Sequence, residues 1–191
     1  MESREISFGE EKVRPDVRTL GELSSVLLEQ DSVMGIERNP AYFMYRNLAK
    51  NKADWERITN AGLRYDITII PPGRLGIEHV KTLGHFHPNA PNSDLAYPEL
   101  YQVMSGRGHY LMQKMGPEGG VDDAVIVEAR QGEIVLIPPG YGHVTINPMK
   151  LELRMANWVC RNFKSDYEVF KANQGAAYYE TVENEWIANE R

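Results

Sequence analysis

Cysteine is nearly absent from this chain of 191 residues, which has Cys160 and no second one. A disulfide framework is therefore excluded, and a reducing compartment suits the sequence. No hydrophobic run approaches the ~20 residues that a membrane-spanning helix requires; runs such as 134–137 have the length of a strand. Residues 1–18 carry charges of both signs and lack the apolar core of a signal peptide. We therefore expect a soluble, cytoplasmic protein without a membrane partner.

An excess of positive charge is also missing. The chain has 21 Lys and Arg residues against 27 Asp and Glu residues, a formal net charge of −6. Such a protein has no general electrostatic attraction to nucleic acid, so we expect no nucleic-acid partner. An anionic small molecule can still bind, but only through donors placed locally around it.

Short runs of β-type residues separated by turn residues dominate the sequence from Leu63 onward. Many short strands with regular turn signals are typical of an all-β sandwich or barrel. Apolar residues at helical spacing predict a short helix near 18–30, and "KADWERITNAG" predicts another that ends at Gly62. We predict a single domain with an N-terminal extension (1–62), a β-barrel (about 63–160) and a C-terminal helical tail (161–191).

His85 and His87 are two of the five histidines and lie one residue apart in "GHFHPNAPNSDLAYPELYQVMSG". Residues i and i+2 of a strand point to the same face, so both imidazoles can bind one ion while Phe86 packs on the opposite face. The alternative interpretation is a chance pair on the outside of a strand. The pair by itself does not decide between these two interpretations.

Two longer motifs contain the candidate metal ligands. The first contains Gly76, His85, His87, Glu99 and Gly106, and the second contains Gly132, Pro138, Gly140, His143 and Asn147. Together they resemble the two motifs of the cupin superfamily, with a longer gap than usual between the second histidine and the glutamate. The resemblance implies a cupin double-stranded β-helix, a jelly-roll barrel, with short N-terminal and C-terminal helical extensions. It also implies one divalent metal ion held by His85, His87, Glu99 and His143.

The donor set agrees with this implication. Three neutral imidazoles and one carboxylate leave a divalent cation a net charge of +1, and they suit Fe, Mn, Ni or Zn. Two neighbouring positions of an octahedral ion would remain open for substrate oxygens. We predict iron(II), with Mn, Ni and Zn as alternatives. The other histidines, His79 and His109, have no place in either motif, and we expect them to be structural.

A closer resemblance narrows the function. The pieces "TLGHFH", "ELY" and "PPGYGHVTIN" make the region from about 64 to 167 similar to the archaeal cupin-type glucose-6-phosphate isomerases. This resemblance implies a homodimeric, metal-dependent isomerase that interconverts glucose 6-phosphate and fructose 6-phosphate through a cis-enediol. It implies Glu99 as the catalytic base. It further implies that Thr68, Thr82 and the backbone N–H of Gly84 hold the phosphate end of the substrate, with Tyr101 and Tyr167 lining the site.

Strand parity agrees with some of these contacts and not with others. Tyr101 shares a face with Glu99, as a contact in the same site requires. Counting by twos from His85 places Thr82 on the other face, so Thr82 reaches the site only if a bulge at Gly84 shifts the register.

Two other functions stay open at this point. A metal-dependent cupin dioxygenase would use the same four ligands in an apolar pocket, whereas this chain offers Thr68, Thr145, Tyr101 and Asn147. A non-catalytic sugar-binding cupin often lacks ligands that this chain retains. The chain also departs from the isomerases that it resembles, because Val159 and Ser165 stand where those proteins carry tyrosine and histidine. A further hypothesis places Tyr42 and Tyr45 over the site.

Overall fold

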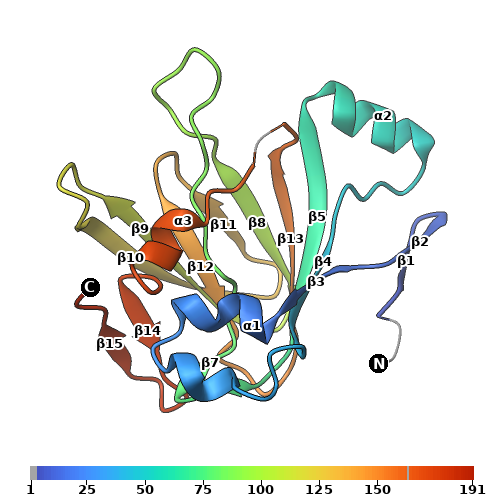
Figure 1. The fold of residues 1–191 in the computed structure, drawn as a ribbon. Coiled ribbons are helices and arrows are strands. Elements are labelled where there is room, and N and C mark those ends of the chain that lie inside the picture. The colour runs from blue at the N-terminus through green and yellow to red at the C-terminus, as the bar shows by residue number, and fades with distance from the viewer. Residues whose placement is uncertain (1–3, 163) are drawn as a thin grey trace.

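Two antiparallel β-sheets form the centre of the molecule in the computed structural model, which describes residues 4–162 and 164–191 (Figure 1). Within these residues the larger sheet has six strands, in the order β11 (Ile134–Ile137), β8 (Glu99–Ser105), β13 (Leu153–Cys160), β5 (Leu63–Ile70), β4 (Pro40–Tyr45) and β3 (Asp16–Thr19). Over the same residues the smaller sheet has the order β10 (Val121–Arg130), β9 (Arg107–Met115) and β12 (Gly142–Ile146). From β8 to β13 the chain passes repeatedly between the sheets. This arrangement confirms the predicted all-β jelly roll.

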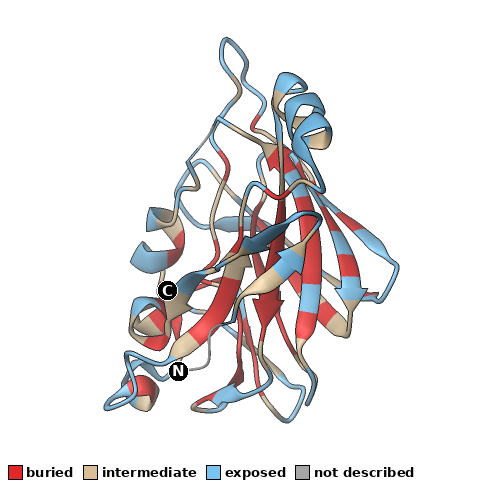
Figure 2. Cartoon of the chain, turned by 90° about the vertical axis from the view of Figure 1, so that its right-hand side faces the viewer, coloured by how far each residue is buried: buried red, intermediate tan, exposed pale blue. Residues whose placement is uncertain are grey.

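Alternating burial along the strands explains which face of the larger sheet points inward. On β8, Glu99, Tyr101 and Val103 are buried, whereas Leu100 and Met104 are exposed. The strands contain most of the buried residues in Figure 2, and β12 is buried along its whole length. Because the two inward faces bury apolar side chains against each other, the hydrophobic effect holds the sheets together.

Two strands from the N-terminal part of the chain, β3 and β4, join the edge of the larger sheet. The helix expected near 18–30 is present as short pieces, namely α1 (Leu20–Leu23) and two 3₁₀ turns (Ser24–Val26 and Gln30–Val33). The second predicted helix is present as α2 (Lys52–Asn60), capped by the Asn51 side chain. None of its described residues is buried, so α2 stands on the surface.

An N-terminal hairpin covers part of the outer face of the larger sheet. It consists of β1 (Ile6–Phe8) and β2 (Glu11–Val13), and its apolar residues pack on a second core that lies outside the main one. That second core contains Phe43, Tyr45, Leu48, Ile67, Ile69 and Ala156. The strands β4 and β5 are therefore buried on both faces.

The C-terminal region contains a helix, as predicted, followed by a hairpin that the sequence pattern did not indicate. The helix is α3 (Glu168–Ala172), and the hairpin is β14 (Tyr178–Glu180) with β15 (Trp186–Ala188). Earlier in the chain, β6 (Arg74–Leu75) and β7 (Glu78–His79) form a smaller strand pair. Among the described residues, no helix combines the length and apolarity needed to cross a membrane.

His109 on β9 connects this C-terminal hairpin to the smaller sheet. Its Nδ1 lies 2.8 Å from the buried carboxylate of Glu180, and its Nε2 lies 3.2 Å from Glu128 on β10. Neither His109 nor His79 belongs to the cluster of possible metal ligands described below, as expected for structural histidines.

This contact predicts a pH-dependent stability. Burial lowers the pKa of His109, but the interactions with Glu180 and then Glu128 outweigh it and raise the pKa above the usual 6.5. The stabilisation is therefore complete below the unfolded-state pKa and is lost as the pH rises through the folded-state pKa. Urea unfolding of the wild type should show a stability that falls as the pH rises from below 6.5 through the raised pKa of His109. His109→Gln should remove this loss, and an unchanged pH dependence in the variant would contradict the assignment.

Candidate metal centre

The segment His85-Phe86-His87 is extended, but isolated bridges rather than a regular strand hold it in place. His85 and His143 on β12 exchange two backbone hydrogen bonds, with N–O distances of 3.2 and 3.0 Å. On its other side, Phe86 exchanges two with Asp166, at 2.8 and 2.9 Å. The ring of Phe86 packs against an aromatic ring of α3, as expected for a residue that faces away from the histidines.

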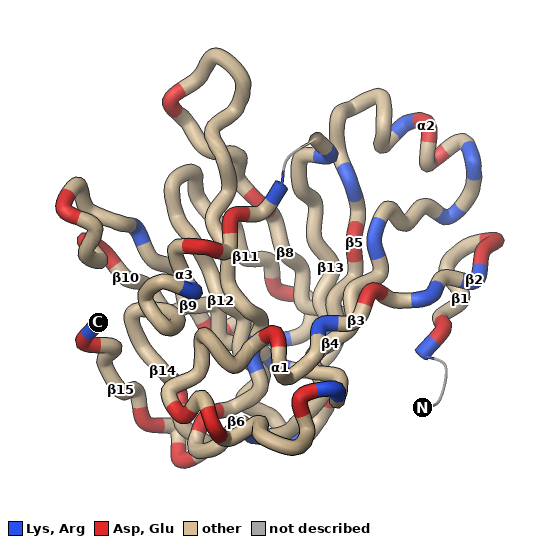
Figure 3. Tube along the Cα trace, in the orientation of Figure 1, with Lys and Arg blue, Asp and Glu red and all other residues tan. Residues whose placement is uncertain are grey.

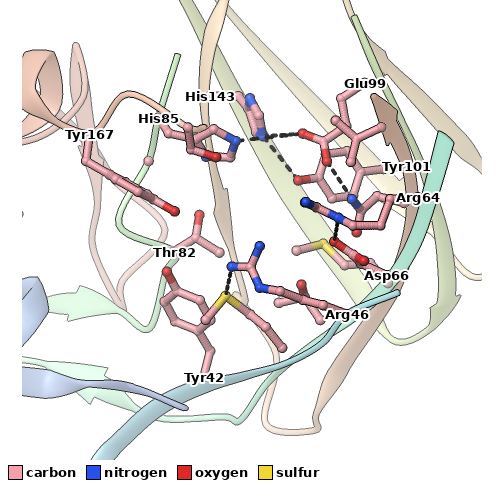
Figure 4. Close-up of a pocket in the computed structure, with 17 residues that line it drawn as sticks. Tyr42, Arg46, Arg64, Asp66, Thr82, His85, Glu99, Tyr101, His143 and Tyr167 are labelled. Atoms are coloured by element: carbon pink, nitrogen blue, oxygen red, sulfur yellow. Dashed lines mark hydrogen bonds and ion pairs between the residues drawn. The ribbon is translucent and has the colours of Figure 1, made fainter. Parts of the chain in front are cut away.

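Four side chains from three separate parts of the chain converge on one point. Figure 4 shows three of them, His85, Glu99 and His143. His85 and His87 come from the extended segment, Glu99 from the start of β8 and His143 from β12. One possible ligand atom of each lies within 4.8 Å of all the others. The Oε2 atom of Glu99 lies 3.2 Å from Nε2 of His87, 3.3 Å from Nε2 of His143 and 3.9 Å from Nε2 of His85.

The hydrogen bonds around this point indicate that lone pairs converge there. Nδ1 of His87 lies 2.7 Å from the backbone oxygen of Tyr97, and a carbonyl oxygen can only accept, so Nδ1 carries the proton. In the neutral ring, Nε2 then presents a lone pair toward Nε2 of His85, 3.1 Å away, and toward Glu99. Oε2 of Glu99 is buried without a hydrogen-bond donor. A divalent cation would satisfy this set of acceptors, so the residues fit a metal ion.

Protonation states agree with this fit. Burial lowers the pKa of His85 well below 6.5, with a further decrease from the charge of His143, and burial likewise lowers the pKa of His143. Burial alone would raise the pKa of Glu99, but its interactions with His143 and His87 hold that pKa well below its usual value. Neutral imidazoles and an ionised carboxylate are the forms that bind metals.

Asn157 orients the glutamate. Its Nδ2 group on β13 donates to Oε1 of Glu99 at 2.6 Å, which leaves Oε2 directed toward the histidines. Hydrogen bonds of this kind fix the orientation of metal ligands. The hydroxyl of Tyr101 lies 3.2 Å from Nε2 of His143, the nitrogen that faces Glu99, so Tyr101 stands beside the metal position. The sequence motifs did not indicate Asn157.

A pocket opens beside the four residues, and alternate residues of neighbouring strands line it. The lining comprises Tyr42, Met44, Arg46, Arg64, Asp66, Thr68, Thr82, Gly84, His85, Glu99, Tyr101, His143, Met155, Asn157, Val159, Ser165 and Tyr167. The structure thus brings all five predicted substrate contacts, Thr68, Thr82, Gly84, Tyr101 and Tyr167, to one cavity next to the metal candidates. His87 lies behind this lining, with a fully buried imidazole.

Thr82 reaches the pocket because the register shifts by one residue. Thr82 pairs with Thr145, and His85 pairs with His143. The chain therefore advances three residues from Thr82 to His85, while the paired strand β12 advances only two residues from His143 to Thr145. The extra residue lies next to Gly84, whose φ of +83° is a left-handed conformation that glycine adopts without strain. The bulge that the parity of Thr82 required is therefore present.

The two tyrosines expected over the site lie on opposite faces of β4. Tyr42 lines the pocket, and its hydroxyl oxygen accepts a 3.4 Å hydrogen bond from the backbone of Leu83. The hydroxyl of Tyr45 donates to the backbone oxygen of Arg4 in the outer core, so the expectation for Tyr45 is wrong. Strand alternation explains the difference, because the two tyrosines are three positions apart and odd offsets point to opposite faces.

Several other polar pocket residues were not among the sequence candidates. Arg64 and Asp66 share the inward face of β5 with Thr68, so counting by twos from Thr68 would have found them. Arg46 lies just past β4, on the face of Tyr42 and beyond the reach of either motif.

Comparison with known proteins agrees with this site. Residues 17–191 match the sequence profile of the glucose-6-phosphate isomerase (GPI) family. This chain belongs to that family.

The individual relatives are distant. The glucose-6-phosphate isomerase of Thermococcus litoralis is 28% identical over 137 residues, which cover 72% of this chain and 65% of the relative. The Pyrococcus furiosus enzyme of the same name is 27% identical over 137 residues, with the same shares. The matched region therefore spans about 65% of the length of these relatives. A solved oxalate decarboxylase of Lactobacillus farciminis has a TM-score of 0.47 at 16% identity, covering 66% of this chain and 30% of that one.

The converging lone pairs predict tight, stoichiometric metal binding. We expect His87→Ala and His143→Ala to lose most of the bound metal, by roughly ten- to a hundredfold or more in affinity, because each removes a ligand. His79→Ala, which removes a histidine outside the cluster, should retain one metal ion per chain. Elemental analysis after dialysis measures all three variants. Equal metal content in His87→Ala and His79→Ala would exclude the four residues as the metal site.

Proposed function

We propose that this protein is a metal-dependent glucose-6-phosphate isomerase that interconverts glucose 6-phosphate and fructose 6-phosphate through a cis-enediol. The observation that carries this proposal is the set of four converging ligand atoms beside a polar pocket. Membership of the isomerase family and relatives of that name support the same reaction.

The bound ion in this proposal is iron(II), with Mn, Ni or Zn as alternatives. When bound, it would supply Lewis-acid polarisation of the substrate carbonyl and neutralise negative charge that develops on neighbouring oxygens. His85, His87, His143 and Glu99 would hold it.

Glu99 is the proposed base that moves a proton between C1 and C2 of the open-chain sugar. Its low pKa keeps the carboxylate ionised, although it also makes the carboxylate a weak base. Asn157 holds Oε1 and Oε2 faces the metal position, so Oε2 would have to detach from a bound ion before it takes the proton. Burial and the charge of Glu99 raise the pKa of Tyr101 well above 10, so this phenol stays protonated and can donate to a substrate oxygen.

The polar lining of the pocket favours a sugar phosphate over an oxygen-activating reaction. A dioxygenase is expected to surround its open metal positions with apolar residues that admit O₂. This pocket instead presents two arginines, Asp66 and two threonines. Hydroxyl and charged groups at these positions match the hydroxyls and phosphate of a hexose phosphate.

Metal removal tests the proposed reaction. The purified protein should convert glucose 6-phosphate to fructose 6-phosphate, lose the activity after chelation, and regain it when iron(II), Mn, Ni or Zn is added back. Glu99→Gln should lower kcat by roughly 10²–10⁴-fold, the usual contribution of a positioned base. His79→Ala is the matched control and should keep wild-type activity. A coupled assay for fructose 6-phosphate measures each sample.

A protein that retains its metal but shows no isomerisation would contradict the proposal. Activity that persists through complete metal loss would contradict the role of the four ligands instead. Reaction in D₂O distinguishes proton transfer from hydride transfer, because only an exchangeable proton introduces deuterium into the product.

We also propose that the protein forms a homodimer through the outer face of the larger sheet. Leu100, Leu136 and Trp158 lie in one row across β11, β8 and β13 and are exposed by 37%, 55% and 37%. Ile134 and Met104 extend the row into an apolar patch that the N-terminal hairpin does not cover. Exposed apolar patches of this kind commonly mark protein interfaces.

Sedimentation of a single variant tests this interface. Leu136→Lys introduces a charge within the patch, at the β11 end of the row, and should shift a dimer toward monomer, because an unpaired charge is costly to bury. Leu151→Lys makes the same change at a leucine that is 68% exposed outside the patch and should leave the dimer intact. A monomeric wild type, or a Leu136→Lys dimer of unchanged stability, would contradict the proposal.

A further inference from the structure

Arg46 projects its guanidinium group into the pocket, on the side where Tyr42, Thr82 and Tyr167 also point inward (Figure 4). It lies just past the end of β4, so the backbone of the sheet edge fixes where the side chain begins. Its side chain is 32% exposed, which leaves it accessible to a ligand that enters the pocket.

The contacts of Arg46 leave most of its donors available. Its Nε lies 3.2 Å from Oδ2 of Asp16, whose side chain is 69% exposed. Its Nη2 lies 3.1 Å from the sulfur of Met44, and a thioether is only a weak acceptor. Within residues 4–162 and 164–191, Asp16 is the one carboxylate paired with Arg46, and a pair with so exposed a partner is weak.

Arg64, the second arginine of the pocket, differs in this respect. Its Nε donates to Oδ2 of Asp66 at 2.7 Å, and the two side chains are exposed by only 17% and 6%. Asp66 is fixed further by the backbone N–H of Asn47, at 2.9 Å. The buried carboxylate of Asp66 neutralises the charge of Arg64. Of the two arginines that line the pocket, Arg46 is therefore the one whose charge is available to a ligand.

Donors from Thr82, Thr68 and Gly84 also line the pocket, and they are neutral. The Oγ1 atom of Thr82 accepts from the backbone of Thr145 at 2.9 Å, which leaves its O–H free to donate. Thr68 and the backbone of Gly84 are also neutral parts of the lining. Ser165 adds one more hydroxyl, and Val159 adds no polar group.

A phosphate monoester has a charge of about −1.5 to −2 near neutral pH and is best held by a charged donor. Acidic and basic residues are interspersed over the molecule (Figure 3), and the net charge is −6, so no global field attracts an anion. The attraction must come from a local cation.

We propose that Arg46 binds the phosphate group of the substrate, exchanging its exposed partner Asp16 for two phosphate oxygens. The planar guanidinium can donate two parallel hydrogen bonds to a phosphate, and Thr82 points into the pocket on the same side (Figure 4). This inference rests on the proposed function, since it assigns the phosphate end of the same sugar-phosphate site. Arg46 is thus a specificity residue for phosphorylated over free sugars.

Kinetics of charge variants test this role. Arg46→Gln should raise KM for glucose 6-phosphate roughly ten- to a hundredfold, the usual range for lost hydrogen bonds to a charged group, and should change kcat less. Competitive inhibition by inorganic phosphate should weaken by a similar factor. Arg46→Lys should restore part of the loss, and Asp16→Asn should lower KM by freeing the guanidinium. Arg57→Gln, at an exposed arginine of α2, is the matched control and should match the wild type.

Thermal unfolding and metal content establish that each variant is folded and loaded. A folded, metal-loaded Arg46→Gln protein with wild-type KM and wild-type phosphate inhibition would overturn the proposal and leave the isomerase function standing.

If the wild type has no isomerase activity, calorimetric titration with glucose 6-phosphate tests Arg46 separately, with sorbitol as the unphosphorylated control. Binding at least tenfold weaker in Arg46→Gln than in the wild type would support Arg46 as the phosphate site. Equal binding by the two proteins, or no binding by either, would overturn it.

Discussion

Two backbone hydrogen bonds between His85 and His143 connect the parts of the chain that form the site. They join the extended segment before the long loop to β12, which follows that loop by many residues, and they set the distance between the imidazoles. The one-residue shift beside Gly84 precedes this pairing and turns Thr82 toward the same pocket. Metal candidates and predicted substrate contacts therefore share one cavity because of a single local register.

Electrostatic complementarity explains why the site should bind a cation and an anion side by side. The imidazole lone pairs of His85 and His87 and the carboxylate of Glu99 face one another at short range, an arrangement that a divalent ion relieves. The same pocket contains Arg46, whose weakly held charge suits a phosphate. Both groups line one pocket, so the proposed sugar phosphate would bring its carbonyl end to the metal ligands and its phosphate to Arg46.

Much of the fold and of the site could be read from residue patterns. Turn residues between short apolar runs indicated the β-barrel, and the period of two placed Tyr101 beside Glu99. Those patterns act over a few residues, where backbone geometry alone decides which side chains share a face. They could not show that β3 and β4 join the sheet, or that Asn157 on β13 would meet Glu99 on β8, because strand neighbours are chosen by packing.

The sequence by itself determined the kinds of ligand present, their order along the chain and the absence of a general anion-attracting field. Only the tertiary structure decided that His85, His87, Glu99 and His143 meet within 4.8 Å, and that Arg46 enters their pocket while Tyr45 faces the opposite core. The physical reason is that ligand chemistry belongs to each side chain, whereas convergence depends on strand pairing and on one register shift between distant segments.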